Sequence, residues 1–207
     1  MIDLVDGRLS HEALVEDANH ESGHAIAAVR LGIGPLPQGI ELYPSGELCA
    51  KTSQVIYGRA FTCQKTQGSP GPRVETENSI QVLVAGPLAQ FRLHTAFKGF
   101  GWELDSDIPA RSFEIRLDGW AQDLSAVRMY LEDIPECERA ETYKRLLEGT
   151  KNMVECQLSA IKKVAQELLR NYSPQVNIVR LSGKRIVEVF NQINNTQTCV
   201  ISDCSSL

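Results

Sequence analysis

Two histidines and a glutamate near the amino terminus have the spacing of a metal site. His20 and His24 are four residues apart, so on an α-helix their Cβ atoms lie about 5–6 Å from each other. Two imidazole nitrogens arranged in this way suit Zn²⁺, which binds histidine nitrogen at about 2.0–2.1 Å. Glu21 follows His20 directly and would lie beside a metal-bound water, where a carboxylate acts as a general base. The pattern His-Glu-x-x-His therefore predicts a zinc centre with a hydrolytic base.

The flanking sequence predicts a helix that would carry these residues. Ser10 is a capping residue type, small and apolar residues run from Ala13 to Leu31, and Gly32 is a helix-ending residue. Glu21 interrupts an otherwise apolar stripe, so we expect a partly buried carboxylate with a raised pKa, which a general base can use. The alternative is a pair of ordinary surface histidines. The helix start, the helix end and the apolar face favour the metal site.

A catalytic zinc needs a third protein ligand in addition to the two histidines, and an open position for water. A histidine six residues after His24 would extend the motif, but Arg30 occupies that position. Glu41 and Glu47 belong to an expected hairpin. The best candidate is Asp123, because it lies on the apolar face of an expected helix and needs a partner there. Three other carboxylates are weaker candidates, because the sequence does not predict a helix that would fix them: Asp105, Asp107 and Asp118.

The composition favours a globular protein of one domain. The chain has 207 residues, of which 43% are hydrophobic and 23% are charged, so it is long enough to bury a core. A formal net charge of −5 without a basic tract argues against a nucleic-acid partner. The acidic amino terminus is unlike a secretory signal, and the longest uncharged run, residues 78–91, is too short to span a bilayer. We therefore expect a cytoplasmic protein without an integral membrane segment.

One small β-hairpin is expected after the first helix. Residues 39–55 predict two strands joined by a turn at Pro44-Ser45-Gly46. Residues 56–73 are rich in Gly, Pro, Gln and Thr and predict a surface loop. A second long loop, residues 97–119, is expected to lie over the site, because long loops in compact domains are usually functional or disordered.

Apolar periodicity predicts the remaining helices. One begins at residue 76 or 78 and runs to 91, with a kink or a division at Pro87. The next begins near residue 120, and another runs from Pro135 to about residue 170 with an interruption at Gly149. A final helix is capped by Ser182 and ends at residue 193. His94 has no motif around it, and we expect a structural role for it.

The expected fold class is mainly α (α+β), a bundle-like helical domain with one small hairpin. We expect a single domain over residues 1–193, followed by a disordered polar tail over residues 194–207.

Several segments together resemble the peptidase domain of the FtsH family of zinc proteases, over about residues 10–193. The segments are 20–25, 39–46, 84–90 and 122–124. The resemblance implies that His20, His24 and Asp123 bind one Zn²⁺ and that Glu21 activates a water. It implies a zinc metallopeptidase that hydrolyses peptide bonds, and an extended substrate that pairs with an edge of the hairpin near Lys51.

This chain departs from the family in two respects. The family's membrane anchor and its ATPase module, with the phosphate-binding loop, have no counterpart in the sequence. We therefore expect an ATP-independent metalloendopeptidase for peptides or unfolded proteins, unless a separate ATPase partner supplies the motor. Ala85, Gly86 and Pro87 replace the family's Gly-Gly-Arg, and Gln90 replaces an acid. These changes affect the local packing and leave a homo-oligomer unproven.

Two other functions remain open from the sequence. The first is a non-catalytic module that keeps the peptidase fold and binds peptides or a partner protease. The intact Glu21 argues against it, because a carboxylate on an apolar stripe is unfavourable without a role. The second is a metal-dependent hydrolase of a non-peptide substrate, which the same zinc chemistry permits.

Overall fold

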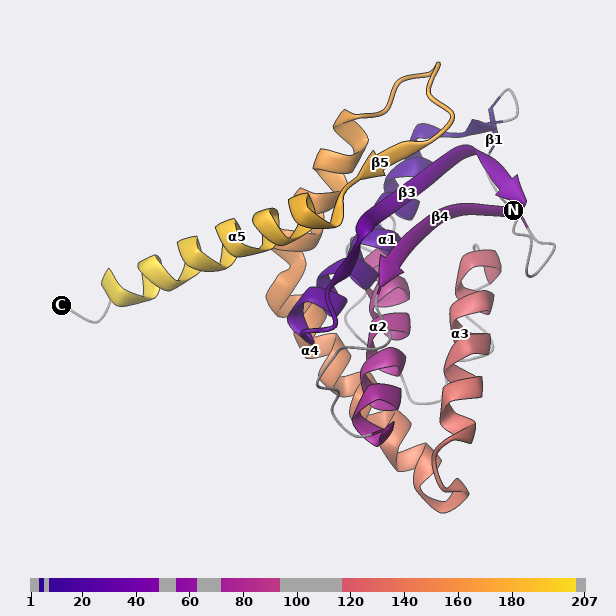
Figure 1. The fold of residues 1–207 in the computed structure, drawn as a ribbon, viewed down its shortest axis with the longest axis vertical. Helices are drawn as coiled ribbons and strands as arrows, with labels where there is room; N and C mark the ends of the chain where they lie inside the picture. Colours follow the sequence, from indigo (N-terminus) through magenta and orange to yellow (C-terminus); the bar gives the residue numbers. More distant parts are fainter. Residues whose placement is uncertain (1–3, 6–7, 49–54, 63–71, 94–116, 204–207) are drawn as a thin grey trace.

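The computed structural model describes residues 4–5, 8–48, 55–62, 72–93 and 117–203. These ranges contain five helices and two small antiparallel sheets, so the expected mainly helical α+β class is confirmed (Figure 1). The helices are α1 (His11–Arg30), α2 (Pro72–Leu93), α3 (Leu117–Glu132), α4 (Glu136–Arg170) and α5 (Gly183–Asp203). The strands are β1 (Leu4–Val5), β2 (Arg8–Leu9), β3 (Pro35–Leu48), β4 (Val55–Thr62) and β5 (Val179–Leu181).

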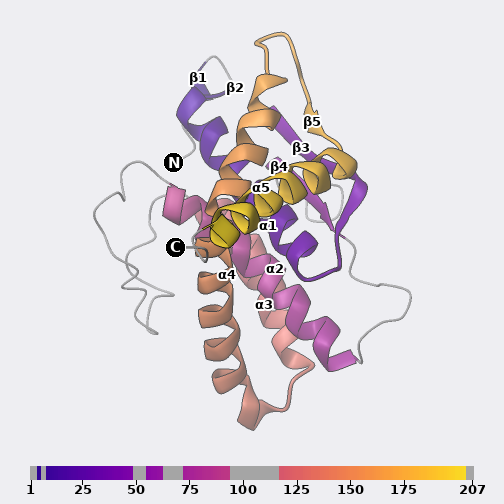
Figure 2. The ribbon, with the colours of Figure 1, turned by 90° about the vertical axis from the view of Figure 1, so that its left-hand side faces the viewer.

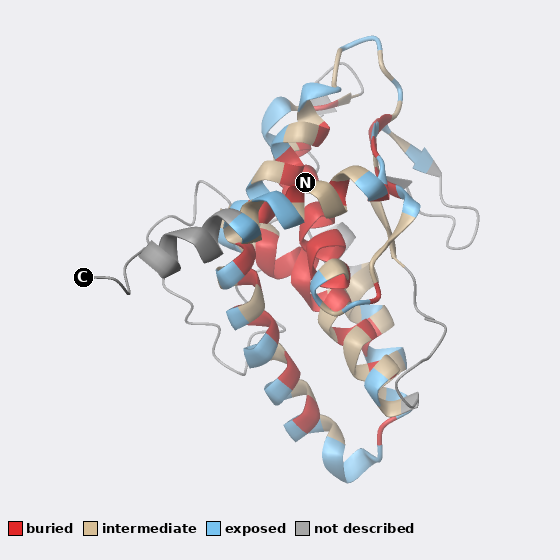
Figure 3. Ribbon diagram, turned by 60° about the vertical axis from the view of Figure 1, so that its left-hand side comes forward, coloured by how far each residue is buried: buried red, intermediate tan, exposed pale blue. Residues whose placement is uncertain are grey.

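Helix α1 lies at the centre of the molecule. It contacts α2 and α4 as well as β3 and β4, whereas α5 packs directly on β3 (Figure 1). Every residue from Ala18 to Ala28 is buried, as expected for a helix covered on all sides (Figure 3). Ser10 Oγ accepts a hydrogen bond from Ala13 N–H at 3.2 Å, and Gly32, with φ +73°, follows the last turn. The predicted helix and its cap are confirmed.

The main sheet has three strands in the order β4-β3-β5, so it is one strand larger than the expected hairpin. Ile40 and Leu42 of β3 are fully buried. The expected turn at Pro44-Ser45-Gly46 is wrong, because these residues lie within β3. The register shifts between Leu42 and Glu47, and Gly46 has φ +77°. The turn-forming residues therefore produce an irregular bulge inside a strand instead of ending it.

Strand β4 also corrects the expected loop over residues 56–73. Residues 55–62 pair with β3, with Leu42 opposite Gly58 and Ile40 opposite Ala60. Residues 63–71 lie outside the described part of the chain, as do Lys51, His94 and residues 97–116 of the second expected loop.

The two interior helix breakers do not end their helices. α2 begins at Pro72, earlier than expected, and continues through Pro87 to Leu93, because it packs against α1, α3 and α4. α4 continues through Gly149 over 35 residues and lies beside α2 (Figures 1 and 2). A glycine lowers helix stability by about 1 kcal/mol, and the buried stripe on both sides of it outweighs that amount. The stripe includes Leu146, Val154, Ile161 and Leu168.

Helix α5 is capped as expected but ends later. Ser182 Oγ accepts a hydrogen bond from Arg185 N–H at 3.3 Å. The helix continues to Asp203, so residues 194–203 of the expected disordered tail are helical, and residues 204–207 lie outside the described part. Asn194 Nδ2 donates to Phe190 O at 2.9 Å, which is a contact along the helix.

Among the helices that the structure describes, none has the length and apolar character needed to cross a membrane.

Candidate metal centre

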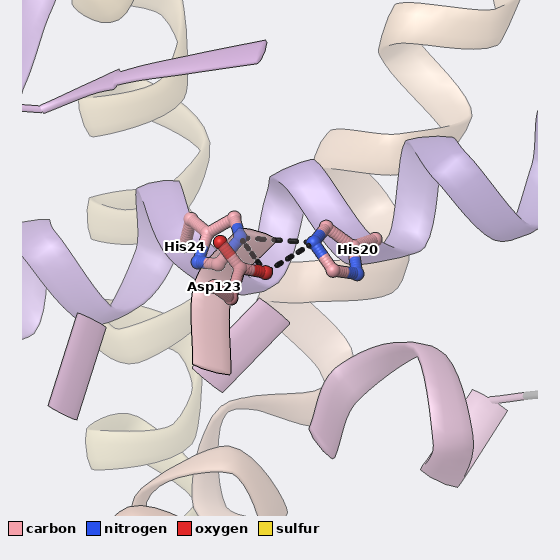
Figure 4. Close-up of side chains that lie close together, drawn as sticks. All are labelled: His20, His24 and Asp123. Atoms are coloured by element: carbon pink, nitrogen blue, oxygen red, sulfur yellow. Dashed lines mark hydrogen bonds and ion pairs between the residues drawn. The ribbon is translucent and has the colours of Figure 1, made fainter. Parts of the chain in front are cut away.

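The structure brings the three predicted ligands together from two helices. His20 and His24 lie one turn apart on α1, and Asp123 approaches them from α3 (Figure 4). The Nε2 atoms of the histidines are 3.0 Å apart. Asp123 Oδ2 lies 3.0 Å from His20 Nε2 and 3.3 Å from His24 Nε2. Three ligand atoms therefore form one compact triangle.

The size of this triangle fits zinc. Tetrahedral ligands at about 2.0–2.1 Å from an ion lie about 3.3–3.4 Å from one another. The three separations, 3.0, 3.0 and 3.3 Å, are slightly shorter than this spacing. Two imidazoles and one carboxylate are also a ligand set that zinc accepts in catalytic sites, where the fourth position is left for water.

Both histidine rings are oriented by α2 through their other nitrogen. His24 Nδ1 lies 2.7 Å from Val82 O, and His20 Nδ1 lies 2.9 Å from Gln90 Oε1. A carbonyl oxygen only accepts, so Nδ1 of His24 is the protonated nitrogen. The same holds for His20 with the amide oxygen as acceptor. In neutral rings the Nε2 lone pairs then face each other and the carboxylate. Hydrogen-bond partners on the other ring nitrogen impose this arrangement on metal-binding histidines.

The electrostatics of the triangle require a positive charge. Asp123 Oδ2 is buried, and it forms ion-pair contacts with the Nε2 atoms of both rings. Burial alone would raise the pKa of Asp123, but the two histidines hold it well below its usual range. Burial would also lower the pKa of His24, yet Asp123 raises it to about 9. A proton or a metal cation can supply the charge.

Glu21 lies beside the triangle without belonging to it. Its residue is 8% exposed, so the burial expected from the sequence is confirmed. Its side chain rests on β4: a Cβ added to Gly58 would lie 2.7 Å from Glu21 Cγ and 2.8 Å from Oε1. Burial raises the pKa of Glu21, and the nearby histidines oppose this effect. The structure thus shows a buried carboxylate with a raised pKa, as expected from the sequence.

Glycines set the close approach of α1 and α2. A Cβ on Gly23 would lie 2.6 Å from Ala89 Cβ and 2.7 Å from Ala85 O. A Cβ on Gly86 would lie 2.3 Å from His24 Nε2, so the imidazole occupies the space that a larger residue would fill. Only a glycine in α2 allows the ring to lie where it does.

Sequence reasoning missed the residues that support the site: Val82, Gly86, Gln90 and Gly58. Gly86 and Gln90 lie in the segment that departs from the FtsH pattern, which was the available signal. Of the other candidate ligands, Asp105 and Asp107 lie outside the described residues. Asp118, which was expected to lie off a helix, belongs to the first turn of α3. Comparison with known protein families and with curated proteins finds no match for this chain.

Proposed function

We propose that this protein is a zinc-dependent metalloendopeptidase that hydrolyses peptides or unfolded proteins without ATP. One observation carries the proposal: three ligand atoms from His20, His24 and Asp123 converge at 3.0–3.3 Å beside a buried carboxylate, Glu21. The resemblance of the flanking segments to FtsH-type peptidases is consistent with this chemistry. The proposal includes one Zn²⁺ per chain.

Each side chain has a distinct part in the proposed reaction. His20, His24 and Asp123 would hold the zinc, which supplies Lewis acidity for a carbonyl and lowers the pKa of a bound water. Asp123 contributes the single negative charge among the ligands. Glu21 takes the proton of the water at a carboxylate oxygen and then donates it to the leaving amine. Its raised pKa makes the first transfer easier, because a stronger base takes the proton of the water more readily.

Strand β4 supports a peptide as the substrate. In the order β4-β3-β5, β4 lies at an edge of the sheet, and its residue Gly58 touches Glu21. An extended chain that paired with this edge would lie beside the general base, with its register fixed by backbone hydrogen bonds.

The net charge of −5 gives no reason to include a nucleic acid as a partner. A cytoplasmic location and a separate ATPase partner belong to the proposal as secondary parts.

The test combines zinc analysis with a cleavage assay. We expect about one zinc per chain and cleavage of casein or an unstructured peptide by the wild type. Glu21→Gln should keep the zinc and lower the cleavage rate by about 10²–10⁴-fold, the usual contribution of a general base. The matched control is Glu12→Gln, since Glu12 is an exposed acid on the same helix. It should change neither zinc content nor rate.

Other outcomes separate the alternatives. Zinc without cleavage in the wild type would favour a peptide- or protease-binding module, or a hydrolase of a non-peptide substrate. A wild-type protein that binds no zinc would overturn the proposal.

A further inference from the structure

One stripe of α2 lies against the two histidines. Val82, Gly86 and Gln90 are spaced by four residues, so they share one face of the helix. Val82 pairs with His24, and Gln90, two turns later, pairs with His20, which precedes His24 in the chain. The order of the partners is reversed, so α2 runs antiparallel to α1 along this contact. Each of the two rings therefore has its hydrogen-bond partner on a different turn of the same face of α2.

The orientation of His24 depends on the backbone. Its Nδ1 donates to the main-chain oxygen of Val82 at 2.7 Å, which any residue at that position would provide. Gly86 leaves space for the ring, since an added Cβ would lie 2.3–2.8 Å from three of its atoms. The tautomer of His24 is thus set by the path of the helix.

The orientation of His20 depends on a side chain. The described partner of its Nδ1 is Gln90 Oε1, at 2.9 Å. An amide oxygen accepts this proton without adding a charge, which a carboxylate in the same place would do. With Nδ1 held in this way, the lone pair of His20 Nε2 is directed at His24 and Asp123.

We propose that Gln90 is the positioning residue that makes His20 a metal ligand. Its uncharged amide then leaves Asp123 as the one carboxylate, among the described residues, in ion-pair contact with the two rings. The inference rests on the metal centre proposed above. Its physical basis is that partners of this kind fix the tautomer and the direction of a metal-binding histidine. A carboxylate there would orient the ring equally well but would reduce the net positive charge of the loaded centre.

The experiment measures metal binding and does not need activity. Zinc affinity is determined by competition with a chelator, and the ligand field is read from the visible absorption of the Co²⁺-substituted protein. Gln90→Leu keeps the approximate size and removes the acceptor, so zinc affinity should fall by about 10–100-fold and the Co²⁺ spectrum should change. Gln90→Glu restores an acceptor and should bind zinc within a few-fold of the wild type.

A second glutamine on α2 provides the control. Gln81 Nε2 lies near Gly149 of α4, on another face of α2, so Gln81→Leu should bind zinc like the wild type. Circular dichroism of every variant shows whether the helices are retained.

The outcomes are separable from those of the proposed function. Wild-type affinity in folded Gln90→Leu would overturn the inference while leaving the zinc site in place. Equal losses in Gln90→Leu and Gln90→Glu would overturn it as well, because the loss would follow from the size or shape of the residue. If the wild type binds neither Zn²⁺ nor Co²⁺, the proposed function fails first, and the role of Gln90 fails with it.

Discussion

At the scale of single residues, the site is a group of side chains that needs a cation. Two imidazole nitrogens and a carboxylate oxygen lie within 3.0–3.3 Å of one another in a buried place. In the metal-free protein a proton on His24 satisfies Asp123, and the pKa of His24 rises to about 9 for that reason. The zinc that we propose would therefore compete with the proton for the same nitrogen.

This competition predicts the pH dependence of stability. The pKa of His24 rises from its usual 6.5 in the unfolded chain to about 9 in the folded one, so the stabilisation is complete below pH 6.5. It is lost as the pH rises through 9. We expect the Tm of the EDTA-treated protein to fall between pH 6.5 and about 9.5, by more than the Tm of the zinc-loaded protein.

The control for this prediction is Asp123→Asn. Without the carboxylate, His24 loses the charge that raises its pKa, and the fall in Tm over this range should flatten in the metal-free protein. An unchanged slope in Asp123→Asn would show that another group titrates.

The assignment of the third ligand gives a second prediction. Asp123→Asn should remove bound zinc, because the amide carries no charge and the buried rings then lack a counter-ion. Asp118→Asn changes an acid five residues earlier in α3 and should keep about one zinc per chain. Zinc content is measured after gel filtration, by atomic absorption. The reverse pattern would move the ligand to Asp118.

A third prediction concerns the space beneath His24. Gly86→Ala would place a Cβ 2.3 Å from His24 Nε2, so the ring must leave the triangle and zinc should be lost. Gly149→Ala is the matched control, since the nearest atom to its added Cβ is 3.5 Å away. That change should keep zinc and raise the free energy of unfolding by up to about 1 kcal/mol, because alanine favours a helix. Denaturant unfolding and zinc analysis test both variants.

At the scale of elements, the sequence predicted what depends on local patterns. The first helix, its Ser10 cap and the spacing of His20 and His24 follow from periodicity and capping, and the structure shows all of them. The breakers Pro44, Pro87 and Gly149 were misleading, because each lies in an element that long-range contacts maintain. A local pattern carries no information about the strength of such contacts.

The junction of α4 and α5 gives a fourth prediction, at this scale. Arg185 forms a two-pronged ion pair with Glu167, at 2.7 and 2.8 Å, and this pair joins the two helices. Arg185 is partly exposed, so its removal by Arg185→Ala should lower the free energy of unfolding only slightly. Lys184→Ala, at the exposed neighbouring position, should leave it unchanged. Urea unfolding of both variants is the measurement.

At the scale of the whole molecule, the site joins parts of the chain that are distant in the sequence. Asp123 could be predicted from its place on an apolar helix face, because burial of an acid requires a partner. Val82, Gly86, Gln90 and Gly58 could not be predicted in the same way. Their roles depend on how α2 and β4 pack against α1, and each is an ordinary residue within its own segment.

The attachment of α3 has a consequence for metal removal. α3 packs mainly on α2, and Asp123 links it to the central helix. Zinc held by α1 and α3 would act as a removable cross-link that closes a loop of roughly a hundred residues. Chelation should accelerate amide hydrogen exchange in residues 121–132 while the buried centre of α1 remains protected. The supply of zinc would then determine how stably α3 is attached to the rest of the protein. This effect would not depend on whether the protein cleaves a peptide bond.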